Sequence, residues 1–189
     1  IVVHFRDRVQ AFLDRGNLVI GICNGFQVLV KTGLLPGPVA DGEASFAQTT
    51  TVTYNDSGKY EDRWVHLRVD TDRCVFLQRG EILYLPVAHG EGKVIPSSDE
   101  HLQALKRLGR VALRYVGPKG EDHPGYPANP NGAIDDIAGL CDATGRVLGL
   151  MPHPERHLTG LQHPSWTRQG PAAEGDGRRI FSRAVAYFQ

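Results

Sequence analysis

The spacing of apolar residues predicts a strand–helix unit near the start of the chain, preceded by another helix. From Val2 to Leu13 apolar side chains recur at helical intervals, which predicts a helix over about residues 3–15. A continuous apolar run at 18–22 then leads into an amphipathic segment at 25–32. A strand that passes directly into a helix is the building block of an α/β sheet.

Strand-like segments dominate the rest of the chain. Runs rich in β-branched and aromatic residues predict three strands in the middle, at 48–54, 64–70 and 82–88. Turn-forming residues at 54–58 separate the first two of these. Three later apolar runs predict further strands, at 111–116, 137–142 and 147–152.

Helices and loops complete this pattern. A helix with a serine cap is predicted at 98–108, and a last helix at 178–188. Residues 36–46 and 157–177 are rich in Gly, Pro and polar residues and are expected to form loops. The strand–helix unit combined with consecutive strands predicts an α/β fold with a mixed sheet and helices on both faces.

Composition narrows the classes of protein that the pattern allows. The 189 residues are enough for one domain, and 21 basic residues balance 21 acidic ones, which gives no sign of nucleic-acid or anionic-membrane binding. No apolar run approaches the roughly 20 residues of a membrane span. The three cysteines are far apart and form no CxxC pair, which predicts neither disulfides nor a metal site, but a cytoplasmic protein. We expect a single domain over residues 1–189.

A cysteine occupies the strand-to-helix junction. The pattern Gly21-Ile22-Cys23-Asn24-Gly25 is that of a nucleophile elbow, in which small neighbours make room for a strained nucleophile. Side chains at the two glycine positions are expected to collide with the turn. The start of the helix is expected to favour a thiolate at Cys23 and to stabilise a developing oxyanion. The alternative is an inert, buried cysteine in a tight turn.

A thiol nucleophile needs a partner for proton transfer, and His153 is the strongest candidate. It follows the apolar strand 147–152, at the strand end where α/β sheets collect active-site residues. Pro152 and Pro154 argue against a helix there. In an extended segment Glu155 points to the same side as His153 and can orient it. The alternative is a proline-rich turn with a solvent-facing histidine.

Other polar residues are weaker candidates for the pocket or for an interface. His89 follows another apolar strand, and Glu91 lies two residues beyond it. Asn129 and Asn131 belong to an Asn-Pro-Asn-Gly segment. Its composition first indicates a turn, and the second interpretation is a polar wall of a pocket. The remaining histidines lack the spacing of metal ligands.

The motifs in this order resemble the class I (triad) glutamine amidotransferases, over about residues 9–188. In that family a cysteine in a G-x-C-x-G-x-Q elbow and a later H-P-E segment form the triad. Four segments resemble, more narrowly, the glutaminase subunits of phosphoribosylformylglycinamidine synthase in purine biosynthesis: GICNGFQ (21–27), LPVAHGEG (85–92), NPNG (129–132) and MPHPER (151–156).

The resemblance implies a fold and a set of roles. The expected fold is flavodoxin-like, with a mixed, mostly parallel sheet and helices on both faces. Cys23 would attack glutamine, with His153 and Glu155 completing the triad. Asn24 would donate its N–H to the oxyanion, and Gln27 would help to hold the substrate. Family members begin with a further βα portion, which supplies a second oxyanion donor, so the chain is expected to be truncated before Ile1.

The resemblance also implies a partner. Ammonia would pass to a synthetase subunit that converts formylglycinamide ribonucleotide into formylglycinamidine ribonucleotide with ATP. The sequence has no G-x-x-x-x-G-K-[ST] loop, so ATP and Mg²⁺ are expected on the synthetase and no cofactor or metal on this chain. Residues 36–46 and 157–175 are candidates for docking. Two alternatives stay open: another thiol hydrolase of the same superfamily, and a non-catalytic regulatory subunit of a synthetase.

Overall fold

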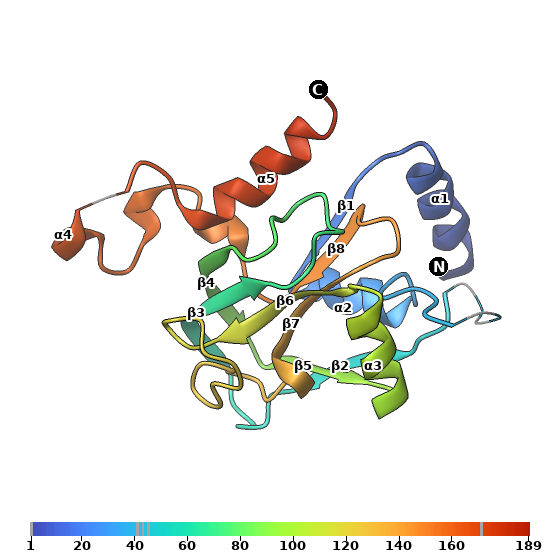
Figure 1. The fold of residues 1–189 in the computed structure, drawn as a ribbon, viewed down its shortest axis with the longest axis horizontal. Coiled ribbons are helices and arrows are strands. Elements are labelled where there is room, and N and C mark those ends of the chain that lie inside the picture. Colours follow the sequence, from blue (N-terminus) through green and yellow to red (C-terminus); the bar gives the residue numbers. More distant parts are fainter. Residues whose placement is uncertain (1, 41, 43, 45, 171) are drawn as a thin grey trace.

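The strands form two separate sheets (Figure 1). The structure is a computed structural model that describes residues 2–40, 42, 44, 46–170 and 172–189, with only the backbone of residues 2–5. The larger sheet has the strand order β1-β8-β7-β6-β3-β4, and β2 pairs with β5 in the smaller sheet. The strands are β1 (Val19–Ile22), β2 (Thr50–Tyr54), β3 (Glu61–Val69), β4 (Ile82–His89), β5 (Glu91–Pro96), β6 (Val111–Val116), β7 (Ile137–Cys141) and β8 (Val147–Leu150).

Five α-helices and three short 3-10 turns accompany these sheets in the described part of the chain. The α-helices are α1 (Val2–Asp14), α2 (Asn24–Lys31), α3 (Asp99–Arg107), α4 (Trp166–Gln169) and α5 (Asp176–Ala186). The 3-10 turns are η1 (Ile134–Asp136), η2 (Pro154–Arg156) and η3 (Gly160–Gln162). The four long helices and seven of the eight strands are those that the sequence predicts. The predicted cap of α3 is confirmed, because the Ser98 side chain accepts the His101 N–H at 3.1 Å.

The α/β class is confirmed, but the expectation of a mostly parallel sheet is wrong. Among the described strands only β1 and β8 pair in parallel, and the four other neighbouring pairs of the larger sheet are antiparallel. A parallel pair needs a crossover that returns to the same sheet. Here α2 leads from β1 to the smaller sheet, and α3 leads back from it to β6. These helices therefore connect two sheets rather than neighbouring parallel strands.

The region around residue 90 also differs from expectation. The turn at 54–58 is present, with Gly58 N–H donating to Asn55 O at 2.9 Å, but β2 and β3 belong to different sheets. The partner of β2 is β5, which the sequence pattern does not predict as a strand. Gly90 and Gly92 interrupt the alternation of polar and apolar side chains there, because glycine contributes no side chain to either face.

Loop predictions hold for most of the remaining chain. Within 36–46 the described residues form neither helix nor strand, while Asp41, Glu43 and Ser45 lie outside the description. The stretch 157–177, which includes the undescribed Pro171, is not entirely loop, because it contains η3 and α4. In the part of the chain that the structure describes, no helix is long and apolar enough to cross a bilayer.

The core fixes where the functional residues emerge. Phe26 and Leu29 on α2 are buried together with Leu148 and Leu150 on β8, so the helix is anchored on the parallel pair. Fully burying a side chain such as Phe26 contributes about 1.5–3 kcal/mol. The pairing of Ile22 with Leu150 brings the carboxyl ends of β1 and β8 to the same edge of the sheet.

Candidate active site

Cys23 and His153 emerge from that shared edge. Cys23 directly follows β1, and its N–H donates to Leu150 O on β8 at 2.9 Å. His153 follows β8 by three residues, and its N–H donates to Pro86 O on β4 at 2.8 Å. Two backbone hydrogen bonds thus hold the thiol and the imidazole at fixed places, 130 residues apart in sequence.

The turn at Cys23 has the strained backbone of a nucleophile elbow. Cys23 has φ 52° and ψ −108°, in a region that residues with a side chain rarely adopt. The predicted need for glycine is confirmed at Gly21, where a Cβ would lie 2.5 Å from Leu29 Cδ1 and 2.8 Å from the Gly25 backbone. It is wrong at Gly25, where a Cβ would meet no atom within 4 Å, because that face of the first helical turn is open.

These two glycines form a matched pair for a stability measurement. We expect Gly21→Ala to lower the free energy of unfolding by about 1–3 kcal/mol, because the methyl group forces β1 away from α2. Gly25→Ala is expected to leave it unchanged or to raise it by up to about 1 kcal/mol, because alanine suits a helix better than glycine. Urea denaturation of both variants is the measurement. Equal losses would contradict the strand–helix contact.

A carboxylate holds His153, as predicted, but the backbone between the two residues differs from the prediction. Its Nδ1 lies 2.7 Å from Glu155 Oε1. The segment is not extended; residues 154–156 form η2, which begins with Pro154 at a helix position where proline costs no hydrogen bond. Because an ionised carboxylate only accepts, Nδ1 carries a proton, and in the neutral ring Nε2 carries the lone pair. That Nε2 atom is buried without a hydrogen-bond partner among the described residues.

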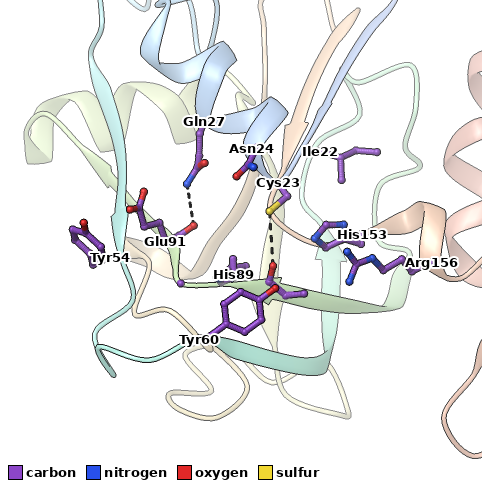
Figure 2. Close-up of a pocket in the computed structure, with 12 residues that line it drawn as sticks. Ile22, Cys23, Asn24, Gln27, Tyr54, Tyr60, His89, Glu91, His153 and Arg156 are labelled. Carbon is purple, nitrogen blue, oxygen red and sulfur yellow. Dashed lines mark hydrogen bonds between the residues drawn. The ribbon is translucent and has the colours of Figure 1, made fainter.

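A pocket of about 640 Å³ opens over the thiol. Figure 2 shows Cys23 between His153 on one side and Gln27 with Glu91 on the other, with Tyr60 below. The lining residues come from β1, α2, β2, β4, β5, η2 and the loops between them: Ile22, Cys23, Asn24, Gln27, Tyr54, Tyr60, Ala88, His89, Gly90, Glu91, His153 and Arg156. Glu155 reaches His153 without lining the pocket. Six lining residues are not among the site residues that the sequence predicts: Ile22, Tyr54, Tyr60, Ala88, Gly90 and Arg156.

Burial and charge act in opposite directions on the thiol. Burial raises the pKa of Cys23, and this effect exceeds the lowering by the Asn24 N–H and by the positive charge of Arg156. The helix start acts as predicted, because the Asn24 N–H lowers the pKa, but burial outweighs this effect and the net pKa of the thiol is raised. The Cys23 thiol contacts Ala88 O at 4.0 Å. A base must therefore take its proton, and His153 presents a free lone pair in the same pocket.

The weaker candidates separate into two groups. Asn24, Gln27, His89 and Glu91 line the pocket, and the Gln27 amide donates to Glu91 O at 3.1 Å. Asn129 and Asn131 do not line it.

Both of these asparagines hold their own loop instead. Asn129 Nδ2 donates to Ala133 O at 3.1 Å and to Asp136 Oδ1 at 2.8 Å. Asn131 Oδ1 accepts the Ala133 N–H at 2.9 Å within the loop, and its Nδ2 donates to Tyr115 Oη on β6 at 3.1 Å. Their predicted turn chemistry is confirmed, and a role as a wall of this pocket is not. Among the described residues no cluster of His, Cys, Asp or Glu could hold a metal ion.

A thiol on a strained strand–helix turn, in one pocket with an imidazole held by a carboxylate, is typical of enzymes that transfer acyl groups through cysteine. Comparison with known proteins narrows this class. A model of the CobB/CobQ-like glutamine amidotransferase domain matches residues 2–188.

Two curated relatives with the same subunit name match most of the chain. The chain is 48% identical over 182 residues to subunit PurQ of phosphoribosylformylglycinamidine synthase from Dehalococcoides mccartyi, covering 96% of the chain and 68% of that relative. It is 42% identical over 189 residues to PurQ from Archaeoglobus fulgidus, covering 97% and 68%. The structure of PurLQS from Thermotoga maritima matches with a TM-score of 0.66 at 31% identity, covering 96% of the chain and 66% of that chain.

The chain thus spans about two thirds of the length of the relatives that it matches. It belongs to the CobB/CobQ-like glutamine amidotransferases and, within them, to the PurQ glutaminase subunits of phosphoribosylformylglycinamidine synthase in purine biosynthesis.

Proposed function

We propose that the chain hydrolyses L-glutamine through a thioester on Cys23 and supplies the ammonia to a synthetase partner. One observation carries this proposal: the thiol sits in a strained turn and shares a pocket with His153, whose Nδ1 is held by Glu155 at 2.7 Å. The pocket volume of about 640 Å³ suits a small ligand such as an amino acid.

In the first half of the reaction, His153 Nε2 takes the thiol proton and Cys23 Sγ attacks the carboxamide carbon of glutamine. The backbone N–H of Asn24 stabilises the oxyanion that forms. The carbon–nitrogen bond then breaks, and the imidazolium gives its proton to the leaving nitrogen, so that ammonia departs and a thioester remains. Glu155 stabilises the imidazolium during this step.

In the second half, water attacks the thioester while His153 Nε2 accepts its proton. The carbon–sulfur bond breaks, glutamate leaves, and the proton returns to the thiol. Because burial raises the pKa of Cys23, the thiol is regenerated in its protonated form. Gln27 donates an amide hydrogen bond within the pocket and is proposed to contact the substrate.

The partner is proposed from the family. The ammonia is used by a synthetase subunit that converts formylglycinamide ribonucleotide into formylglycinamidine ribonucleotide, and ATP and Mg²⁺ belong to that subunit. The likeness to PurLQS of Thermotoga maritima supports an assembly of this kind. Docking through residues 36–46 or 157–175, and a cytoplasmic location, stay predictions.

Product analysis tests the proposal against another thiol hydrolase. Incubation with glutamine is expected to release glutamate and ammonia in equal amounts, and short acyl esters and peptides are expected to yield no product. Hydrolysis of the esters or peptides in place of glutamine would identify a different hydrolase. Absence of any hydrolysis by the chain in complex with its synthetase would favour a regulatory subunit.

A further inference from the structure

A second imidazole in the pocket has an unused nitrogen. His89 ends β4, only 3% of its surface is exposed, and it lines the pocket beside Cys23. Its Nδ1 lies 3.1 Å from Asn55 Oδ1. Its Nε2 is buried and has no hydrogen-bond partner in the described part of the chain. The mechanism derived for Cys23 and His153 does not use this atom.

The contacts of Asn55 determine which nitrogen of His89 carries the proton. Asn55 Nδ2 donates to Lys59 O at 2.9 Å and to His89 O at 2.8 Å. Both of these atoms are carbonyl oxygens, so the amide nitrogen must face them and the amide oxygen must face the ring. An amide oxygen only accepts, hence His89 Nδ1 carries the hydrogen. Nε2 is then a lone pair that can only accept a hydrogen bond.

Neighbouring residues fix the position of the His89 ring. Asn55 is itself 3% exposed, and its N–H donates to Gly90 O at 3.0 Å. On β5 a Cβ at Gly92 would lie 2.4 Å from His89 Cε1, so the ring rests where only glycine leaves room. The tautomer and the orientation of His89 are both fixed before any substrate binds.

We propose that Asn55 is a positioning residue of the proposed glutaminase reaction, because it holds His89 Nε2 as an acceptor for an N–H group of bound glutamine. This inference rests on the proposed function. The pocket therefore contains two imidazoles with different partners. Glu155, a carboxylate, supports a charged His153, whereas Asn55, a neutral amide, gives no such support to His89.

The charged groups around His89 agree with a neutral ring. Burial, together with the neighbouring His153, lowers the pKa of His89 to about 4. Glu61 on β3 pairs with His89 in register and acts in the opposite direction. That carboxylate is already occupied, because Ser57 Oγ donates to it at 2.6 Å and Arg63 forms an ion pair with it.

Steady-state kinetics of Asn55→Asp test the inference. An aspartate side chain cannot donate the two hydrogen bonds that the Asn55 amide donates to Lys59 O and His89 O. Its negative charge favours a charged His89, whose Nε2 would then donate rather than accept. We expect KM for glutamine to rise about tenfold to hundredfold, because the substrate loses a buried hydrogen-bond acceptor. We expect kcat to change less than about threefold. Because the charge is lost as pH rises, the excess KM should shrink between pH 6 and 9.

Asn129→Asp is the matched control, because Asn129 is a buried asparagine that holds a loop outside the pocket. It is expected to lower stability without changing KM. An unchanged KM in Asn55→Asp, or an equal rise in Asn129→Asp, would overturn the inference.

Nitrogen-15 NMR of the unmodified chain gives a test that needs no variant. His89 is expected to show a protonated Nδ1 and an unprotonated Nε2 at pH 7, and the opposite tautomer would overturn the inference. Failure of the unmodified chain to form glutamate would instead remove the proposed function, and the NMR result would still decide the tautomer.

Discussion

Replacing Cys23 with alanine is expected to abolish glutamine-dependent synthesis by the complex, by about a thousandfold or more, while ammonia-dependent synthesis continues. The methyl group fits the same strained turn but cannot form a thioester. Ammonia enters the reaction after the glutaminase step, so the synthetase does not need the thiol when ammonia is added. The measurement is the rate of synthesis with each nitrogen donor.

Cys74→Ala is the matched control. Cys74 is a free cysteine that is 2% exposed in the core and does not line the pocket. This variant is expected to keep both activities. A Cys23→Ala variant that still used glutamine would remove Cys23 from the mechanism.

His153→Gln is expected to lower the rate of glutamate formation by about 10²- to 10⁴-fold, the usual range for loss of a general acid–base group. The effect is large because burial raises the pKa of the Cys23 thiol, so the protein depends on a base to form the nucleophile. Glutamine cannot take over this role, because an amide is not a base near neutral pH. Glutamate release under saturating glutamine is the measurement.

The comparison variant is His163→Gln, in the same C-terminal region. His163 stacks near Trp64 and Tyr84 and does not line the pocket. Its replacement is expected to change the rate by less than about threefold. Similar losses in the two variants would point to a structural effect rather than to proton transfer.

The three residues of the proposed triad can be singled out from the sequence because each depends on a local pattern. Cys23 follows an apolar strand within a glycine motif, and His153 follows another apolar strand. The only long-range requirement is that β1 and β8 end at the same edge, which their parallel pairing provides. The contact between His153 and Glu155 needs only that they lie two residues apart, which is why it survives the change from an extended segment to η2.

The direction of the strands is much harder to predict. All residues of β7 and β8 are buried, and continuous apolar runs of this kind are typical of parallel strands covered on both faces. Here they pair antiparallel through a tight turn, in which Gly145 N–H donates to Asp142 O at 3.3 Å. Burial therefore depends on what covers the sheet rather than on strand direction.

Residues that approach the site from separate strands give no local signal. Tyr54 ends β2 and Tyr60 precedes β3, and they reach the pocket only because the two sheets meet there. In the sequence Asn55 is an ordinary residue of the predicted turn at 54–58. Its contact with His89 spans 34 residues. Arg156 lies next to the predicted triad, and this adjacency is the one signal that could have identified it.

Intact-mass measurement with an electrophilic glutamine analogue, such as its chloroketone, tests the central role of Cys23 most directly. The chain is expected to gain one adduct, which maps to Cys23 and forms more slowly when glutamine competes. Cys23→Ala should gain none, although it keeps Cys74 and Cys141, both buried. An adduct on both proteins, or on neither, would contradict a reactive thiol in a glutamine-binding pocket.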